Sequence, residues 1–188
     1  MKQLAIFASG TGSNFDAIVK SINYGEIPAK AVLLVCDKVG APVIEKAKAQ
    51  GIETFVFTAK EFASKEAYET EILAALKKHK VEWIALAGYM RLIGDTLLKA
   101  YEGHIINVHP SLLPKYKGKD AIERAFEAGD KTIGITIHYV DSGMDTGEII
   151  AQESIELTGD ESLEDVTQKI HQVEHKLYPQ TLAKLLKQ

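Results

Sequence analysis

A histidine and an asparagine at the end of an apolar run are the residues best suited to chemistry in this chain. Residues 105–108 (IINV) are typical of a buried strand, and Asn107 and His109 stand two positions apart at its end. Alternate strand residues share a face, so both side chains would point together at the carboxyl end of the strand, where α/β folds bind ligands. An amide can donate to a developing oxyanion and an imidazole can transfer a proton, so the pair predicts acyl-group chemistry. A structural histidine is the alternative.

A second group of chemically useful residues lies in the turn-rich loop at residues 141–147 (DSGMDTG). Its two acids, Asp141 and Asp145, stand between two strands that are expected late in the chain. An ionised carboxylate beside His109 would favour the charged imidazolium and so support proton transfer. The alternative is a hairpin loop whose acids serve solubility, and spacing does not decide between the two.

Residues 8–15 (ASGTGSNF) join the first apolar run to the first amphipathic stretch. Glycines and free N–H groups at a helix N-terminus are suited to binding a phosphate, so we expect an anion site here. The first two glycines of a G-x-G-x-x-G dinucleotide fingerprint are present, and Asp37 follows the next apolar run, but Phe15 is too bulky for the third position. The simpler alternative is a strand-to-helix turn in which Ser13 or Asn14 is the N-cap.

The elements that would position these residues follow from the alternation of apolar runs with amphipathic stretches. Strands are expected at residues 4–8, 31–36, 54–57, 83–87 and 105–108, with helices after the glycine loop and at 42–50, 65–79 and 95–101. In the last third we expect a helix at 119–128, alternating strands at 133–140 and 148–155, and a helix at 160–177 that breaks before Pro179, followed by a short tail helix. The sequence thus predicts a single α/β domain over residues 1–188, with a doubly wound, mostly parallel sheet and antiparallel strands in the last third.

Composition limits the classes of function that the chain can serve. The 188 residues carry a formal net charge of −4, which disfavours non-specific nucleic-acid binding. No apolar run approaches the roughly 20 residues of a membrane span, and the N-terminus lacks the pattern of a signal peptide. The one cysteine, Cys36, ends an apolar run and is expected to be a small core residue in a reducing compartment. We therefore expect a cytoplasmic protein that binds neither membrane nor nucleic acid.

Five segments, in matching order and spacing, resemble the phosphoribosylglycinamide formyltransferases, folate-dependent enzymes of purine synthesis. They are residues 8–15, MRLI at 90–93, INVHPSLLPKYKG at 106–118, GMDTG at 143–147 and QVEHKLYP at 172–179. The resemblance implies a Rossmann-like formyltransferase fold. It also implies transfer of the formyl group of 10-formyltetrahydrofolate, a co-substrate, to the amine of 5-phosphoribosylglycinamide by direct attack through a tetrahedral intermediate. It implies small-molecule partners and no metal, and it is compatible with a homodimer.

The same resemblance assigns roles to residues by position. Asn107 and a protonated His109 would stabilise the oxyanion, and Asp145 would hold His109 charged. The residues that would bind the ribonucleotide are Gly12, Ser13, Asn14 and, at its glycinamide end, Glu174. Those that would bind the folate are Lys65, Met90, Arg91, Leu92, Ile93, Asn107, Val140 and Asp141. Lys65 stands where many members of the family carry arginine, which keeps the charge but loses the bidentate fork.

Other functions fit parts of the sequence. Residues 171–175 (HQVEH) match the H-x-x-E-H pattern of inverted zinc proteases, but no further ligand type follows them. His109 with Ser111 suggests a serine hydrolase, but the G-x-S-x-G elbow is missing, and Ser111 is expected to cap a turn. Formyltetrahydrofolate hydrolase and methionyl-tRNA formyltransferase are the nearest alternatives, although both carry an additional domain that we do not expect here. A catalytically inert nucleotide-binding module would not need Asn107, His109 and Asp145 together.

Overall fold

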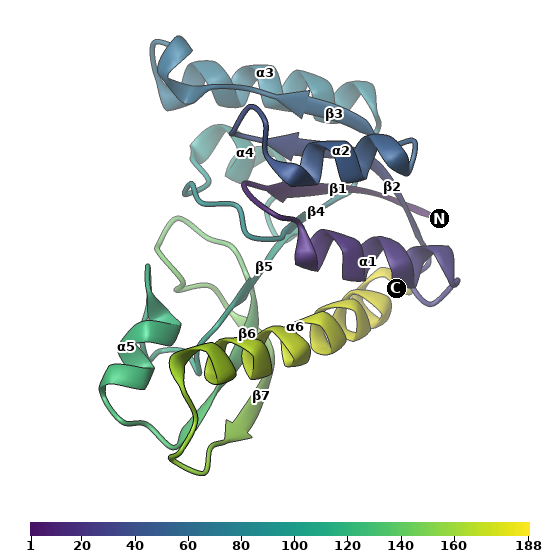
Figure 1. Cartoon of the computed structure of the whole chain (residues 1–188). Coiled ribbons are helices and arrows are strands. Elements are labelled where there is room, and N and C mark those ends of the chain that lie inside the picture. Colours follow the sequence, from purple (N-terminus) through teal and green to yellow (C-terminus); the bar gives the residue numbers. More distant parts are fainter.

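The computed structural model describes residues 1–188, and Figure 1 shows how its helices and strands follow one another. The strands are β1 (Lys2–Ala8), β2 (Ala29–Cys36), β3 (Glu53–Val56), β4 (Trp83–Leu86), β5 (Ile105–His109), β6 (Thr132–Tyr139) and β7 (Ile149–Glu156). The helices are α1 (Ser13–Asn23), α2 (Pro42–Ala49), the 3-10 helix η1 (Ala59–Glu61), α3 (Lys65–Lys78), α4 (Asp95–Ala100), α5 (Ala121–Glu127) and α6 (Leu163–Leu186).

The seven strands form one sheet in the order β3-β2-β1-β4-β5-β6-β7. Neighbouring strands from β3 to β5 are parallel, whereas β6 is antiparallel to both β5 and β7. The chain first leaves β1 toward β2 and later returns to the other side of β1 with β4, so β1 and β4 flank a topological switch point. The prediction of a doubly wound, mostly parallel sheet with antiparallel strands in the last third is confirmed.

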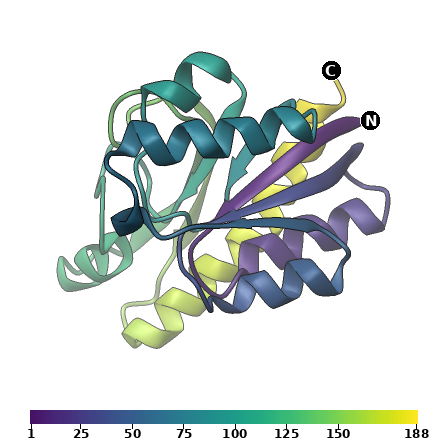
Figure 2. The ribbon, with the colours of Figure 1, turned by 90° about the horizontal axis from the view of Figure 1, so that it is seen from above.

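Helices cover both faces of this sheet and enclose two hydrophobic cores. Figure 2 shows α3 on one side of the strands and α1 and α2 on the other. The core under α1, α2 and α6 includes Phe15, Ile18 and Ile170, and the core under α3 and α4 includes Tyr68 and Leu97. Alternate residues of the central strands fill the two cores in turn, as strands buried on both faces must.

The predicted strands and the helices up to α5 lie within two residues of the observed ones. Local signals set several of these bounds. Pro42 stands in the first turn of α2, where its fixed φ and missing N–H do no harm. The side chain of Ser64 accepts the N–H of Ala67 and so caps α3.

The prediction that the last helix breaks before Pro179 is wrong, because α6 runs unbroken through that residue. Proline has no N–H, so the helix loses one hydrogen bond to the preceding turn, but the surrounding contacts outweigh the loss of this bond. The fully buried Tyr178 donates its hydroxyl to the carbonyl oxygens of Leu86 at 2.8 Å and Ile106 at 3.2 Å. Beyond the proline, Leu182 and Leu186 continue the buried face. Neither α6 nor any other helix is long and apolar enough to cross a membrane.

Candidate active site

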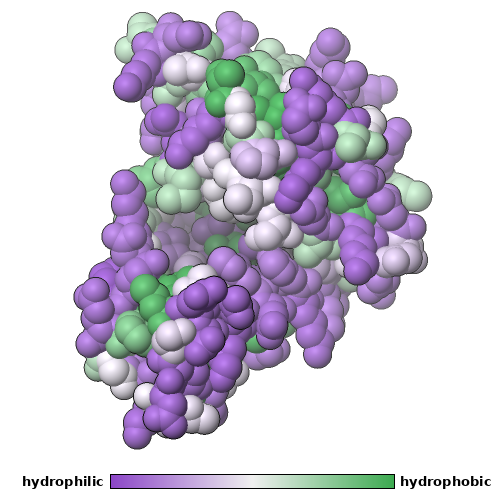
Figure 3. All heavy atoms as spheres, in the orientation of Figure 1, coloured by the Kyte–Doolittle hydropathy of each residue, from purple (hydrophilic) through white to green (hydrophobic).

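A cavity of about 490 Å³ opens at the carboxyl ends of β1, β4 and β5, beside the switch point. Figure 3 shows it as the hollow between the part of the molecule that holds α4 and the part that holds α5. Its lining includes most of the predicted binding and catalytic residues: Gly12, Ser13, Asn14, Met90, Arg91, Leu92, Ile93, Asn107, His109, Val140, Asp145 and Glu174. Lys65 and Asp141 are the two predicted site residues that do not line it.

The glycine loop ends at the N-terminus of α1, in the cavity wall. Gly12 is the N-cap, with a φ of +81°, and no side chain caps the helix, so the alternative in which Ser13 or Asn14 is the N-cap is wrong. A Cβ on Gly12 would lie 2.6 Å from Cγ2 of Val43, so neither the backbone conformation nor the space admits a side chain. The N–H groups of the first turn therefore lack a capping side chain, which suits them to an anion.

Glu174 reaches this loop from α6, 160 residues further along the chain. Its Oε1 accepts a hydrogen bond from Nδ2 of Asn14 at 3.3 Å. Burial raises the pKa of the Glu174 carboxyl to about 7, and the hydrogen bond from Asn14 lowers it only in part. Oδ1 of Asn14 is buried with no protein partner. The two side chains thus form a polar pair with hydrogen-bonding capacity left for a ligand.

His109 is held at the end of β5 by contacts to both ring nitrogens. Nε2 lies 2.7 Å from the carbonyl oxygen of Tyr116, and Nδ1 lies 3.5 Å from Oδ2 of Asp145. A carbonyl oxygen can only accept a hydrogen bond, so Nε2 carries a proton. Nδ1 is therefore the ring nitrogen that faces the carboxylate of Asp145.

Asp145 has a φ of +57°, in the left-handed region that aspartate tolerates better than most residues. Its Oδ2 also accepts the N–H of Gly118 at 2.8 Å. Burial would raise the pKa of this carboxyl, but the hydrogen bonds from His138 and Gly118 and the charge of His109 together lower the pKa below its usual value. Asp145 is thus kept ionised in a largely buried position.

His138, which no sequence motif identifies as a site residue, completes this cluster. It stands opposite Asn107 in the antiparallel pairing of β5 with β6, and Nδ2 of Asn107 lies 3.5 Å from its Nε2. The same Nε2 is 3.6 Å from Oδ1 of Asp145, so one carboxylate lies between two imidazoles. Its position in the strand directly before the acidic loop is the one sequence feature that could have indicated His138. Only the register of β5 with β6 shows that it lies opposite Asn107.

Residues 90–93 line the cavity after β4, and two side chains fix their start. The hydroxyl of Ser9 accepts the N–H of Met90 at 2.9 Å. Nε of Arg91 donates to Oδ2 of Asp37 at 2.8 Å. Asp37, the acid that suggests a dinucleotide fingerprint, is therefore engaged by an arginine, which weakens the interpretation that it binds a ribose.

Lys65 and Asp141 hold backbone of the cavity walls instead of lining the cavity. Nζ of Lys65 donates to the carbonyl oxygen of Leu92 at 2.9 Å. Oδ1 of Asp141 accepts the hydroxyl of Thr146 at 2.6 Å and the N–H of Gly143 at 3.0 Å, which closes the acidic loop into a turn. The hydrogen bond from Thr146 is the main reason why the pKa of Asp141 is lowered.

The remaining motifs have structural roles or no support. Ser111 donates its hydroxyl to the carbonyl oxygen of Lys115, as a turn cap. Cys36 is fully buried, so its prediction as a core residue is confirmed. The structure contains no group of three or more His, Cys, Asp or Glu side chains that could hold a metal ion, so residues 171–175 find no third ligand.

Proteins with this sheet bind ligands at the switch point, and the Asn–His–Asp cluster adds groups that can stabilise an oxyanion and move a proton. The fold and the cavity thus define a Rossmann-like α/β protein equipped for acyl-group transfer. The family model described as formyl transferase matches residues 2–182. The chain belongs to this family.

The resemblance seen in the five sequence segments is confirmed by individual relatives. Phosphoribosylglycinamide formyltransferase of Bacillus subtilis (strain 168) is 56% identical over 186 residues, which cover 99% of this chain and 95% of that protein. The crystal structure of glycinamide ribonucleotide transformylase 1 from Geobacillus kaustophilus is 56% identical, with a TM-score of 0.97 and 99% of each chain covered. The trifunctional purine biosynthetic protein adenosine-3 of Drosophila melanogaster is 40% identical over 98% of this chain but 14% of its own length.

Proposed function

We propose that this chain transfers the formyl group of 10-formyltetrahydrofolate to the amine of 5-phosphoribosylglycinamide, a step of purine biosynthesis. The observation that carries the proposal is that the N-terminus of α1, Glu174 and the cluster of Asn107, His109 and Asp145 all meet in one cavity. The names of the B. subtilis and G. kaustophilus relatives support the same acceptor.

The ribonucleotide is proposed to bind along α1 and α6. The free N–H groups at Gly12, Ser13 and Asn14 take the phosphate, because a helix N-terminus favours an anion. Glu174 accepts only one hydrogen bond from the protein, so its carboxyl is available to N–H groups at the glycinamide end. The unpartnered Oδ1 of Asn14 offers a further acceptor beside it.

The folate is proposed to bind along the other segments of the cavity wall. Met90, Arg91, Leu92 and Ile93 would present backbone groups to the pterin, and Val140 lines the cavity before the acidic loop. Asn107 stands between the two substrates. Lys65 and Asp141 serve the folate through the segments that they hold.

The chemistry requires a stabilised oxyanion and the movement of one proton. As the amine attacks the formyl carbon, the amide N–H of Asn107 and the imidazolium of His109 stabilise the charge that develops on the formyl oxygen. The carbon–N10 bond of the folate then breaks. One proton leaves the amine through the pair formed by Asp145 and His109, and one proton is returned to N10, so the protons balance.

Asp145 supports this step because it stays ionised and faces Nδ1 of His109. Their separation of 3.5 Å is long for a hydrogen bond, but catalytic hydrogen bonds commonly tighten when substrates bind. No residue of the chain has to form a covalent bond to the formyl group.

A spectrophotometric assay with each substrate omitted in turn tests the proposal. We expect turnover of 10-formyltetrahydrofolate, or of its 5,8-dideaza analogue, only when the ribonucleotide is present. Loss of the formyl group without the ribonucleotide would instead identify a hydrolase, and the roles of residues 12–14 and Glu174 would then be withdrawn.

Three further predictions await their own measurements. We propose that residues 1–188 form one domain, since helices from both ends of the chain, α1 and α6, pack together. The homodimer and the cytoplasmic location stay predictions. A sedimentation experiment on the purified protein tests the first of these two.

A further inference from the structure

Two side chains of α3 bind neighbouring backbone groups of the segment that follows β4. Oε2 of Glu69 accepts the N–H of Gly94 at 2.8 Å, and Nζ of Lys65 donates to the carbonyl oxygen of Leu92 at 2.9 Å. Residues 90–93 line the cavity, whereas Glu69 and Lys65 do not. Through these two side chains, α3 holds a segment of the cavity wall in place, although neither side chain lines the cavity itself.

The place of Glu69 in the fold is unusual for an acid. Its side chain is 1% exposed and lies on the helix face that packs into the core under α3 and α4. Burial raises the pKa of this carboxyl, while the N–H groups of Gly94 and Leu97 lower it. Its Oε1 has no hydrogen-bond partner. An apolar side chain can commonly fill a buried position at a lower cost in free energy than a carboxyl group. The role of Glu69 is therefore to hold the backbone at Gly94.

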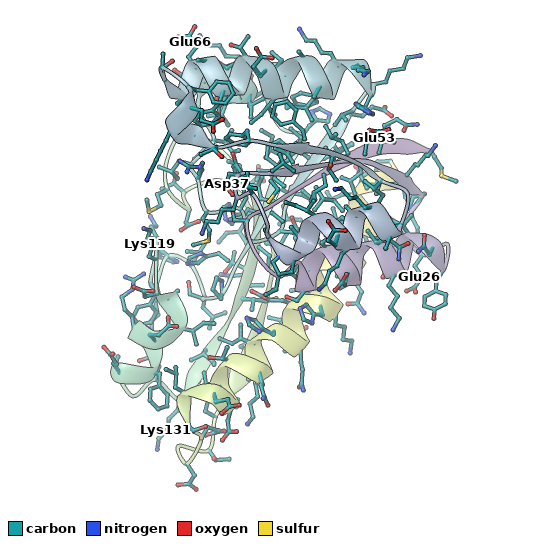
Figure 4. The ribbon with its side chains drawn as sticks, turned by 45° about the horizontal axis from the view of Figure 1, so that its top comes forward. Glu26, Asp37, Glu53, Glu66, Lys119 and Lys131 are labelled. Carbon is teal, nitrogen blue, oxygen red and sulfur yellow. The ribbon has the colours of Figure 1, made fainter.

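Close packing transmits the position of α3 to the segment. A Cβ on Gly94 would lie 2.7 Å from Oε1 of Glu69 and 2.8 Å from Cδ of Lys65, so the backbone rests directly on both side chains. A second buried acid, Asp37, holds Arg91 of the same segment. In Figure 4, Asp37 lies inside the molecule, whereas Glu66 of α3 points away from it.

We propose that Glu69 is a positioning residue for the folate: it holds the N–H of Gly94 and thereby sets the position of residues 90–93, with Lys65 as the second fixed point. The inference depends on the proposed function, in which this segment binds the folate. It concerns the folate alone, because the residues assigned to the ribonucleotide lie on α1 and α6.

The test compares Glu69→Leu with Glu69→Gln in the full-length chain. Calorimetry gives Kd for 10-formyl-5,8-dideazafolate and for the ribonucleotide, and steady-state kinetics give KM and kcat. We expect Glu69→Leu to raise the folate Kd and KM about tenfold, because the Gly94 N–H loses its buried acceptor. The ribonucleotide Kd stays unchanged. Glu69→Gln keeps an oxygen for Gly94 and restores most of the folate affinity.

Two control variants separate positioning from general destabilisation. Glu66→Leu changes an exposed acid on the same helix and leaves the folate Kd unchanged. Leu76→Ala removes a fully buried side chain near the other end of α3, which lowers the melting temperature while the hydrogen bonds of Glu69 and Lys65 to residues 92 and 94 are kept. If Leu76→Ala raises the folate Kd as much as Glu69→Leu, the effect is one of stability and the inference is overturned.

The outcomes also distinguish this inference from the proposed function. Wild-type protein that does not bind the folate analogue overturns both. Wild-type protein that binds it, with Glu69→Leu binding equally well, overturns only the role of Glu69. If Glu69→Leu does not fold, Gly94→Ala tests the contact of the segment with α3 instead, because its methyl group would meet both Glu69 and Lys65 and should raise the folate Kd; an unchanged Kd would overturn the inference.

Discussion

Two acids of the cavity, the buried Glu174 and the largely buried Asp145, have pKa values that move in opposite directions. Glu174 accepts a single hydrogen bond from Asn14, so burial dominates and raises its pKa to about 7. Asp145 is approached by two imidazoles and a backbone N–H, which lower its pKa despite its burial. Environments that separate the pKa values of two acids commonly give them separate roles. Here Asp145 is the permanent anion, and Glu174 can carry a proton near neutral pH.

The raised pKa of Glu174 predicts that Glu174→Gln stabilises the protein at alkaline pH. The folded carboxyl binds its proton more tightly than the unfolded one, whose pKa is 4.5. Below pH 4.5 both states are protonated, so the variant and the wild type should be equally stable. Between pH 4.5 and 7 the wild type loses up to about 3 kcal/mol that the amide does not lose. Urea unfolding of both proteins at pH 5 and pH 8 measures the difference in their free energies of unfolding. If that difference is the same at both pH values, the raised pKa of Glu174 is contradicted.

Asp145→Asn is expected to lower kcat by about two to four orders of magnitude, because the amide cannot stabilise the imidazolium or relay the proton. Asparagine tolerates the left-handed backbone, so the fold and the ribonucleotide Kd should be near normal. Steady-state kinetics across pH check both parts, and the acid limb of the rate profile should move. Unchanged turnover would remove Asp145 from the mechanism.

The secondary-structure elements place these side chains through a few long-range hydrogen bonds. α6 carries Glu174 and Tyr178 one turn apart, and the Tyr178 hydroxyl meets the carbonyl oxygens of Leu86 in β4 and Ile106 in β5. The residue after Leu86 leads into the segment at 90–93, and the residue after Ile106 is Asn107. One hydroxyl therefore ties the helix of the proposed ribonucleotide site to the ends of two strands that lead into the proposed folate site.

Tyr178→Phe removes that hydroxyl without changing the ring. Two buried carbonyl oxygens lose a donor, so we expect a loss of about 1–3 kcal/mol in the free energy of unfolding. Chemical denaturation measures it. Tyr24→Phe is the matched control, because Tyr24 is 70% exposed, and it should leave stability unchanged. If the free energy of unfolding falls equally in both variants, the hydrogen bonds of the Tyr178 hydroxyl do not account for the loss of stability.

Lys65→Met tests whether α3 positions the folate segment or contacts the ligand. The substitution keeps the apolar stem but removes the hydrogen bond to the Leu92 carbonyl oxygen. If Lys65 acts through Leu92, the Kd should rise by a similar factor, about threefold to tenfold, for the folate analogue and for its counterpart without the glutamate tail. A loss confined to the compound with the tail would show direct contact with its carboxylates.

The sequence predicts most of the fold because its signals are local. Alternating apolar runs identify the strands, and Pro42 and Ser64 mark the starts of helices. What it misses depends on distant partners. Pro179 looks like a helix breaker until Tyr178 is seen to dock on β4 and β5. His138 becomes part of the site only through its register opposite Asn107.

Each of the two hydrophobic cores supports a different part of the cavity wall. The core under α1, α2 and α6 supports the residues assigned to the ribonucleotide, and the core under α3 and α4 supports the segment assigned to the folate. The proposed catalytic cluster comes from β5, β6 and the loop between β6 and β7, where the two substrates would meet. Each substrate should therefore stabilise the folded protein through its own side of the sheet.

Thermal unfolding with single substrates tests this division. A ligand at a hundred times its Kd adds about 2.7 kcal/mol to the stability of the folded state, so each substrate should raise the Tm. In Glu174→Ala the rise caused by the ribonucleotide should largely disappear, while the rise caused by the folate analogue stays. Equal losses for both ligands would indicate a general disturbance of α6.

The position of α6 in the chain has a consequence for biosynthesis. α6 follows every other element in sequence, yet it provides Glu174 to the cavity and the Tyr178 hydroxyl to β4 and β5. While the chain emerges from the ribosome, the sheet can form before these partners exist. Binding of the ribonucleotide at its proposed site therefore has to wait for the last helix, and a nascent chain that stalls before α6 carries all seven strands without the contacts that Glu174 and Tyr178 make.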